Sequence, residues 1–188
     1  MKLLFLCVAL LPLITADDAK PCCMPRKLEG KIFGTQELSL FDMARDADLK
    51  MIVLRNAKDK TDPSYTLIDY GKRLIYRRSK DYSCTKTTIL QPQMFSNCVP
   101  ANAKLLAPSH YGPPGVLPIN TFVFTMGNIK MEMMMSVDRC YPVVNRLFGP
   151  NSPNGEALNI FLSLKPTISD MNVFNVDTSN CTAPLILG

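Results

Sequence analysis

Six cysteines that follow an apolar leader constrain this fold more than any other feature of the sequence. The leader, residues 1–16, has a basic start, an apolar run and the small residue Ala16 at its end, which is the layout of a cleaved secretory signal. Cys7 leaves with the leader, and the cysteines that remain are Cys22, Cys23, Cys84, Cys98, Cys140 and Cys181. An even number of cysteines in an exported chain is typical of disulfide bonding. We therefore expect a secreted, extracellular, disulfide-bonded protein.

The cysteine spacing leaves the pairing open. Cys22 and Cys23 are neighbours, so their geometry disfavours a bond to each other, but the sequence does not choose between the other combinations. The spacings match no zinc-binding pattern, and an exported chain offers few thiolates to a metal. Disulfides are therefore the expected state of these cysteines.

The remainder of the chain has the length of one ordinary domain. Residues 17–188 contain no internal repeat, low-complexity tract or linker that would divide them. The leader is shorter than the roughly 20 apolar residues that a membrane-spanning helix needs, and no other stretch comes close. The formal net charge of +5 is only mildly basic and implies no nucleic-acid partner. We expect a single domain over residues 17–188.

Short runs of alternating apolar and polar residues lie between the 15 prolines and 9 glycines of the chain. This alternation predicts strands with one buried face. The predicted strands are residues 28–40, 49–55, a hairpin over 65–76, then 83–90, 121–126, 129–137, 142–148, 156–164 and a short edge at 172–176. The proline-rich residues 92–118 predict a loop with a helical turn near 101–106. The whole pattern favours an all-β fold, either a sandwich or an open barrel.

The stretch NIKMEMMMSVDRC, which starts at Asn128, concentrates thioether side chains in one predicted strand. In that strand Met131, Met133 and Met135 share one face. Two interpretations stay open: the methionines fill the core, or they line a cavity in which flexible thioethers adapt to ligands of varied shape. Under the second interpretation, the candidate lipid-pocket residues are Phe122, Phe124, Met131, Met133, Met135, Leu158, Ile160 and Leu162.

Residues that could perform catalysis are scarce. The single histidine, His110, lies in a loop rich in proline and glycine, and no motif for a nucleophile, a catalytic metal or a phosphate-binding loop is present. We therefore expect no enzymatic activity.

Two further features concern metal binding and modification. Asp42, Asp46 and Asp48 are close enough in sequence to suggest calcium, the only cofactor we consider, but they lack the glycine and terminal glutamate of an EF-hand loop. A solvated turn is the alternative interpretation of this acidic cluster. Asn180 begins the only glycosylation sequon, next to a cysteine, and predicts a glycoprotein.

Four cysteine-containing motifs together resemble those of the ependymin-related family of secreted glycoproteins. The matching motifs are PCCMPRKLEG, YSCTKTTILQP, DRCYPV and SDMNVFNVDTSNC, which occur in the family's order along nearly the whole chain after the leader. The resemblance implies two stacked antiparallel sheets that enclose a hydrophobic pocket, and a homodimer. It also implies binding of a fatty acid or other lipid, calcium binding and cell-matrix adhesion, with the lysosomal lumen as an alternative compartment.

The same resemblance implies a disulfide pattern. By motif, Cys22 would pair with Cys140, and Cys84 with Cys181. Cys23 and Cys98 would then form the third bond. The leading expectation for function is a secreted, non-enzymatic glycoprotein that holds a fatty acid or lipid between its sheets. The alternative is a calcium-dependent extracellular adhesion or signalling protein, whose partners would be the matrix or the cell surface.

Overall fold

The computed structural model describes residues 21–89, 95–106, 108–149 and 157–183, and in these residues the chain is almost entirely strand. The expected signal peptide, residues 1–16, lies outside the described residues. No helix in the described part of the chain is long and apolar enough to cross a membrane. The predicted all-β, antiparallel, disulfide-bonded fold is confirmed.

Twelve strands and one short 3-10 helix make up the described structure. The strands of the N-terminal half are β1 (Lys27–Gly34), β2 (Ser39–Asp46), β3 (Met51–Asn56), β4 (Tyr65–Asp69), β5 (Leu74–Arg78) and β6 (Cys84–Thr88). The C-terminal half contains β7 (Lys104–Leu105), β8 (Ser109–His110), β9 (Pro118–Met126), β10 (Ile129–Ser136), β11 (Pro142–Phe148), β12 (Ala157–Lys165) and the helix η1 (Met171–Phe174).

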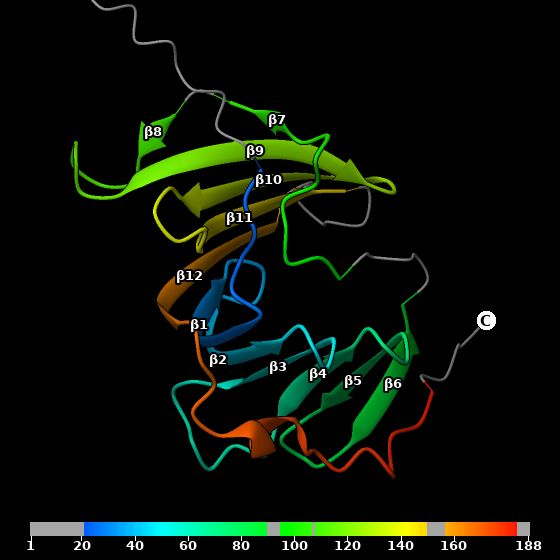
Figure 1. The fold of residues 1–188 in the computed structure, drawn as a ribbon. Helices are drawn as coiled ribbons and strands as arrows, with labels where there is room; N and C mark the ends of the chain where they lie inside the picture. The colour runs from blue at the N-terminus through cyan, green and yellow to red at the C-terminus, as the bar shows by residue number, and fades with distance from the viewer. Residues whose placement is uncertain (1–20, 90–94, 107, 150–156, 184–188) are drawn as a thin grey trace, which may run out of the picture.

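One hydrogen-bonded antiparallel path joins the strands in the order β6-β5-β4-β3-β2-β1-β12-β11-β10-β9-β7, and β8 pairs with β9. Strands β1 to β6 and strands β9 to β12 each form a meander in which successive strands are neighbours, and the β1–β12 pair connects the two halves. Figure 1 shows β9 to β12 as an upper layer above β2 to β6. The path does not close, because β6 and β7 end it. The fold is thus an open, folded-over sheet with an interior between its two layers.

The junction of the halves depends on a glycine. The β1–β12 register shifts between Glu29 and Lys31. A Cβ atom on Gly30 would lie 2.8 Å from Cδ2 of Leu164 and 2.9 Å from the carbonyl oxygen of Leu162. Only a residue without a side chain allows β1 to approach β12 this closely.

The C-terminal segment covers the outer face of the N-terminal half. Phe174 and Cys181 pack against Val53, Leu67 and Tyr76 in one buried cluster. The Cys84–Cys181 disulfide holds this segment beside β6, where Thr182 also forms a bridge with Thr85. The other face of the N-terminal half is left to face the interior.

Three local predictions need correction. The predicted strand over 28–40 is instead two paired strands, β1 and β2. Asp42 and Asp46 therefore lie in a central strand, whereas Asp48 is exposed in the turn that follows it, as the solvated-turn interpretation expects. Residues 171–174 form η1 rather than an edge strand, since the carboxylate of Asp170 caps the turn by accepting from the Asn172 amide at 2.9 Å. The expected helical turn near 101–106 instead contains the short strand β7.

The three disulfides pair Cys22 with Cys140, Cys23 with Cys98, and Cys84 with Cys181. These are the pairs that the family resemblance implies. The bonds span 118, 75 and 97 residues of sequence respectively. Each therefore connects segments that are far apart in the chain.

Candidate functional site

A cavity of about 490 Å³ lies between the two halves of the sheet. Its volume falls in the range of roughly 300–1,000 Å³ that is usual for small-molecule pockets. One wall comes from β9, β10 and the turn between them, and contains Phe124, Met131 and Met133. The opposite wall contains Ile52 of β3 and Tyr70 at the end of β4. The lining is mainly apolar, as expected for a pocket that takes a hydrophobic ligand.

Strand register builds the methionine wall. Met131 of β10 pairs with Phe124 of β9, and Met133 pairs with Phe122. Side chains of directly paired residues lie on the same face of an antiparallel sheet. The aromatic and thioether side chains therefore form one continuous apolar surface, and the predicted alternation along this strand is confirmed for Met131, Met133 and Met135.

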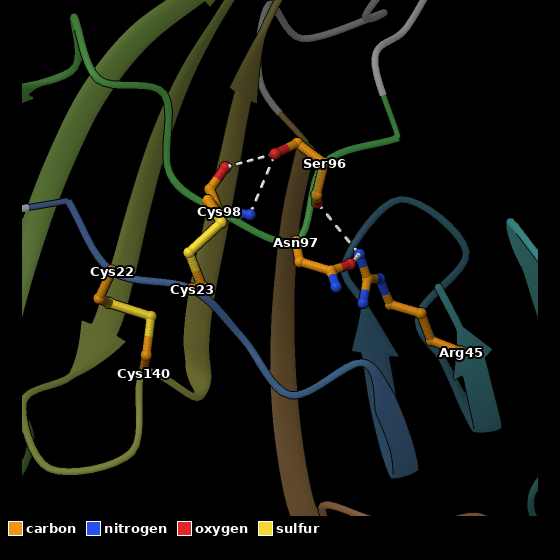
Figure 2. The surroundings of a disulfide bond; sticks show 7 residues. All are labelled: Cys22, Cys23, Arg45, Ser96, Asn97, Cys98 and Cys140. Carbon is orange, nitrogen blue, oxygen red and sulfur yellow. Dashed lines mark hydrogen bonds between the residues drawn. A yellow bond between two sulfur atoms is a disulfide. The ribbon is translucent and has the colours of Figure 1, made fainter. Parts of the chain in front are cut away.

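Two disulfide-linked segments cover one end of this surface. Cys22 and Val99 pack in the same cluster as this surface. The Cys22–Cys140 and Cys23–Cys98 bonds hold their two segments in place (Figure 2). The two segments are also hydrogen-bonded, because the Val99 amide donates to the Cys22 carbonyl at 2.9 Å. We refer to residues 22–24 and 97–100 as the plug.

The methionines of the stripe differ in whether they reach the cavity. Met135 and Phe122 lie in the cluster under the plug and are 0% exposed. Met131 and Met133 belong to the same cluster and also line the cavity. Both interpretations of the stripe therefore describe part of the structure: Met135 is core, whereas Met131 and Met133 form the cavity wall.

The β12 candidates do not lie in this cavity. Leu158 and Ile160 pair with Arg146 and Val144 of β11, which themselves pair with Glu132 and Met134 of β10. That register puts them on the face opposite the methionine stripe. Leu158 packs against the cluster of Ile119, Val143 and Val144, and Leu162 is 42% exposed. The prediction that β12 completes the same wall is corrected by this register.

One buried cation faces this otherwise apolar site. Arg45 of β2 lines the cavity and is only 6% exposed. Its Nη2 donates to the Ser96 carbonyl at 3.0 Å and to Oδ1 of Asn97 at 2.8 Å (Figure 2). The guanidinium carbon lies 4.4 Å from the centroid of the Phe95 ring, and that ring lies 4.7 Å from the Tyr70 ring. Arg45 is thus fixed by hydrogen bonds and by stacking.

Burial sets the electrostatics of this wall. Removal from water lowers the pKa of the Arg45 guanidinium, while Tyr70 and Asp46 act in the opposite direction. Arginine nevertheless stays protonated in proteins. Burial also raises the pKa of the Tyr70 phenol, against the opposing effect of the Arg45 charge. At neutral pH the site therefore contains a neutral phenol beside a buried positive charge.

Sequence reasoning missed Arg45. The sequence pattern that could have indicated Arg45 is the alternation in β2. Phe41, Met43 and Arg45 lie on one face of this strand, and Asp42 and Asp46 lie on the other. The acidic residues around it dominate the local composition and suggest an exposed turn. An arginine that continues an apolar face is the feature that would have indicated a buried cation.

The carboxylates of the acidic cluster are engaged with partners within the protein. Asp42 accepts from Lys31 at 2.7 Å and from Lys60. Asp46 accepts from the backbone amides of Asp48 and Leu49 at 2.8 and 3.1 Å. Among the described residues, no group of three or more histidine, cysteine, aspartate or glutamate side chains could hold a metal ion. The carboxylates are used instead in ion pairs and turns.

The sequon lies on the surface. Asn180 is exposed, whereas the adjacent Cys181 is 4% exposed. The backbone beside it is fixed, because the Thr182 amide donates to the Cys84 carbonyl at 3.1 Å. Glycosylation at Asn180 stays a prediction, and its side chain is accessible.

Comparison with known proteins shows the fold and nothing of the function. No protein-family model matches the chain, and no curated protein matches it. An uncharacterized conserved protein from Thermus thermophilus is similar in structure, with a TM-score of 0.55 and 11% sequence identity over 85% of this chain and 90% of that one. A structure of PNGF-II gives a TM-score of 0.42 and 11% identity, and the match spans 85% of this chain but only 32% of PNGF-II.

Proposed function

We propose that this protein is a secreted, non-enzymatic glycoprotein that binds a fatty acid or other lipid in the cavity between its two sheet layers. The observation that carries the proposal is the cavity of about 490 Å³ with Phe124, Met131 and Met133 on one wall. Each methylene that leaves water for such a wall contributes about 0.8 kcal/mol. An acyl chain of ten or more methylenes would therefore supply most of the binding free energy.

The wall is suited to ligands that differ in chain length or unsaturation. Methionine side chains are unbranched and polarisable, so they adjust to a bound chain at low cost. The plug, in contrast, is held by the Cys22–Cys140 and Cys23–Cys98 bonds. A fixed end and an adaptable wall together favour binding without large rearrangement of the protein.

Secretion and family membership belong to the same proposal. The leader and the disulfides support export. The ordered cysteine motifs and the three disulfide pairs support a place in the ependymin-related family. A homodimer and an extracellular or lysosomal location follow from that family and are proposed on the same grounds.

The test is to identify what the natively secreted protein carries. Purified protein from an animal-cell medium would be extracted with organic solvent and the extract analysed by mass spectrometry. We expect fatty acids or lipids in an amount comparable to that of the protein. A secreted protein of unrelated fold, purified in parallel, controls for lipid carried over from the medium. Protein that contains no lipid, and takes up none after delipidation, would contradict the proposal.

A further inference from the structure

We propose that Arg45 anchors the anionic head group of the ligand, so that the cavity prefers an acyl chain that ends in a carboxylate or a phosphate. This inference rests on the proposed lipid-binding function and adds the chemical class of the ligand. It also assigns to one residue the discrimination between charged and neutral lipids.

The hydrogen bonding of Arg45 is incomplete. Its Nη2 atom is used by Ser96 and Asn97, but its Nη1 atom is buried and has no hydrogen-bond partner within the described part of the chain. A buried donor without an acceptor is destabilising, and more so when it carries charge. An oxygen of an anionic ligand would satisfy both the unused donor and the charge.

No carboxylate of the protein serves this purpose among the described residues. Asp46 follows Arg45 in sequence, but successive side chains of a strand point to opposite faces. The Asp46 carboxylate accepts from the backbone amides of Asp48 and Leu49 and lies 3.5 Å from Nζ of Lys27. It is therefore committed elsewhere.

The cavity combines this single charge with a long apolar surface. Of the residues described as lining it, Arg45 alone is charged at neutral pH. Met131 and Met133 lie on the opposite wall, and Phe95 and Tyr70 pack beside the guanidinium. A ligand with one charged end and one apolar end matches this distribution, whereas a wholly neutral lipid would leave the guanidinium uncompensated.

The head-group site is also preorganised. Phe95 packs against the guanidinium, whose carbon lies 4.4 Å from the ring centroid. Asn97 belongs to the plug, which the Cys23–Cys98 bond holds in place (Figure 2). A cation that is already oriented loses little freedom when an anion binds.

The experiment compares three probes that share one chain length: hexadecanol, palmitate and hexadecyl phosphate. Delipidated full-length protein is loaded with Nile red, a neutral dye that reports occupancy of the apolar cavity, and each probe displaces the dye at neutral pH. The variants are Arg45→Gln, Arg45→Lys and, as a matched control on an exposed arginine of β5, Arg77→Gln. Thermal unfolding verifies that each variant is folded.

We expect the wild type to bind at least one anionic probe about ten- to a hundredfold more tightly than hexadecanol, since a hydrogen bond to a charged group contributes roughly this factor. Arg45→Gln should lose the preference while its affinity for Nile red and hexadecanol stays unchanged. Arg45→Lys should retain part of the preference for anionic probes, and Arg77→Gln should retain all of that preference. Preference for palmitate identifies a carboxylate site, and preference for hexadecyl phosphate identifies a phosphate site.

Equal affinity of the wild type for all three probes would overturn the Arg45 assignment and leave the cavity proposal intact. The same holds if folded Arg45→Gln keeps the preference for anions. If Arg45→Gln does not fold, the test relies on the wild type and on Arg45→Lys. Wild-type affinities for the anionic probes that equal the affinity for hexadecanol contradict the assignment without any variant. Failure of Nile red and all three probes to bind would instead remove the proposed function and the anchor together.

Discussion

At the scale of single residues, position along β10 decides whether a methionine reaches the cavity. Met133 and Met135 lie on the same face of the same strand, yet Met135 is 0% exposed under the plug while Met133 lines the cavity. The sequence predicts that the methionines share one face of the strand, but nothing near them in sequence predicts which of them the plug covers. That coverage depends on which cysteines pair, and composition does not determine that pairing.

This difference predicts opposite outcomes for one substitution at two positions. Met135→Lys places an ammonium where no water can reach it, which costs several kcal/mol, so the protein should misfold or fail to be secreted. Met133→Lys leaves the ammonium in a cavity that can hold water, so the protein should fold but take up little lipid. Secreted yield, the thermal midpoint and lipid content of the two variants provide the measurement. Met133→Leu is the control, with an expected loss of stability under about 1.5 kcal/mol. Equal misfolding of both lysine variants would show that Met133 is core.

At the scale of strands, the sequence predicted most elements and the inward face of β10, but not the face of β12. The hairpin over 65–76 and the turn at Gly127, where φ is +58°, were indicated by glycines between alternating runs. β2 was missed because its acidic residues suggest a turn, although its apolar face continues through Met43 to Arg45. The face of Leu158 and Ile160 could not be predicted, since it depends on pairing with β11 and on the register shift between β1 and β12.

Loss of the Cys23–Cys98 bond and loss of the Cys84–Cys181 bond should have different effects on lipid affinity, because the first bond holds the plug and the second holds the C-terminal segment. Removing Cys23–Cys98 with serines should free one segment of the plug and the Asn97 contact to Arg45, and so reduce lipid affinity as well as stability. Removing Cys84–Cys181 should affect only the outer face of the N-terminal half, and so lower stability with lipid affinity unchanged. On the chain-entropy model each bond contributes up to about 4–5 kcal/mol. Palmitate binding and chemical unfolding of the two double variants test this, and equal losses of affinity in both would contradict a specific role for the plug.

At the scale of the whole molecule, the two halves form one folded-over sheet (Figure 1). The plug fills part of its interior, and the cavity occupies another part. The structural likeness to the Thermus thermophilus protein, at a TM-score of 0.55 and 11% identity, shows that very different sequences adopt this architecture. The all-β class was predictable because strand alternation is local. The cavity was not, because it depends on how far the layers are separated by side chains from distant parts of the chain.

Methyl spectroscopy of the methionines tests the central claim most directly. The chain contains 11 methionines, and each methyl group, once labelled with carbon-13 and assigned by substitution, reports on its own surroundings. When palmitate is added to the delipidated protein, we expect the Met131 and Met133 signals to shift in proportion to the bound fraction while the Met135 signal stays in place. Saturating palmitate that moves none of these signals, or moves Met135 as much as Met133, would contradict a lipid cavity beyond the plug.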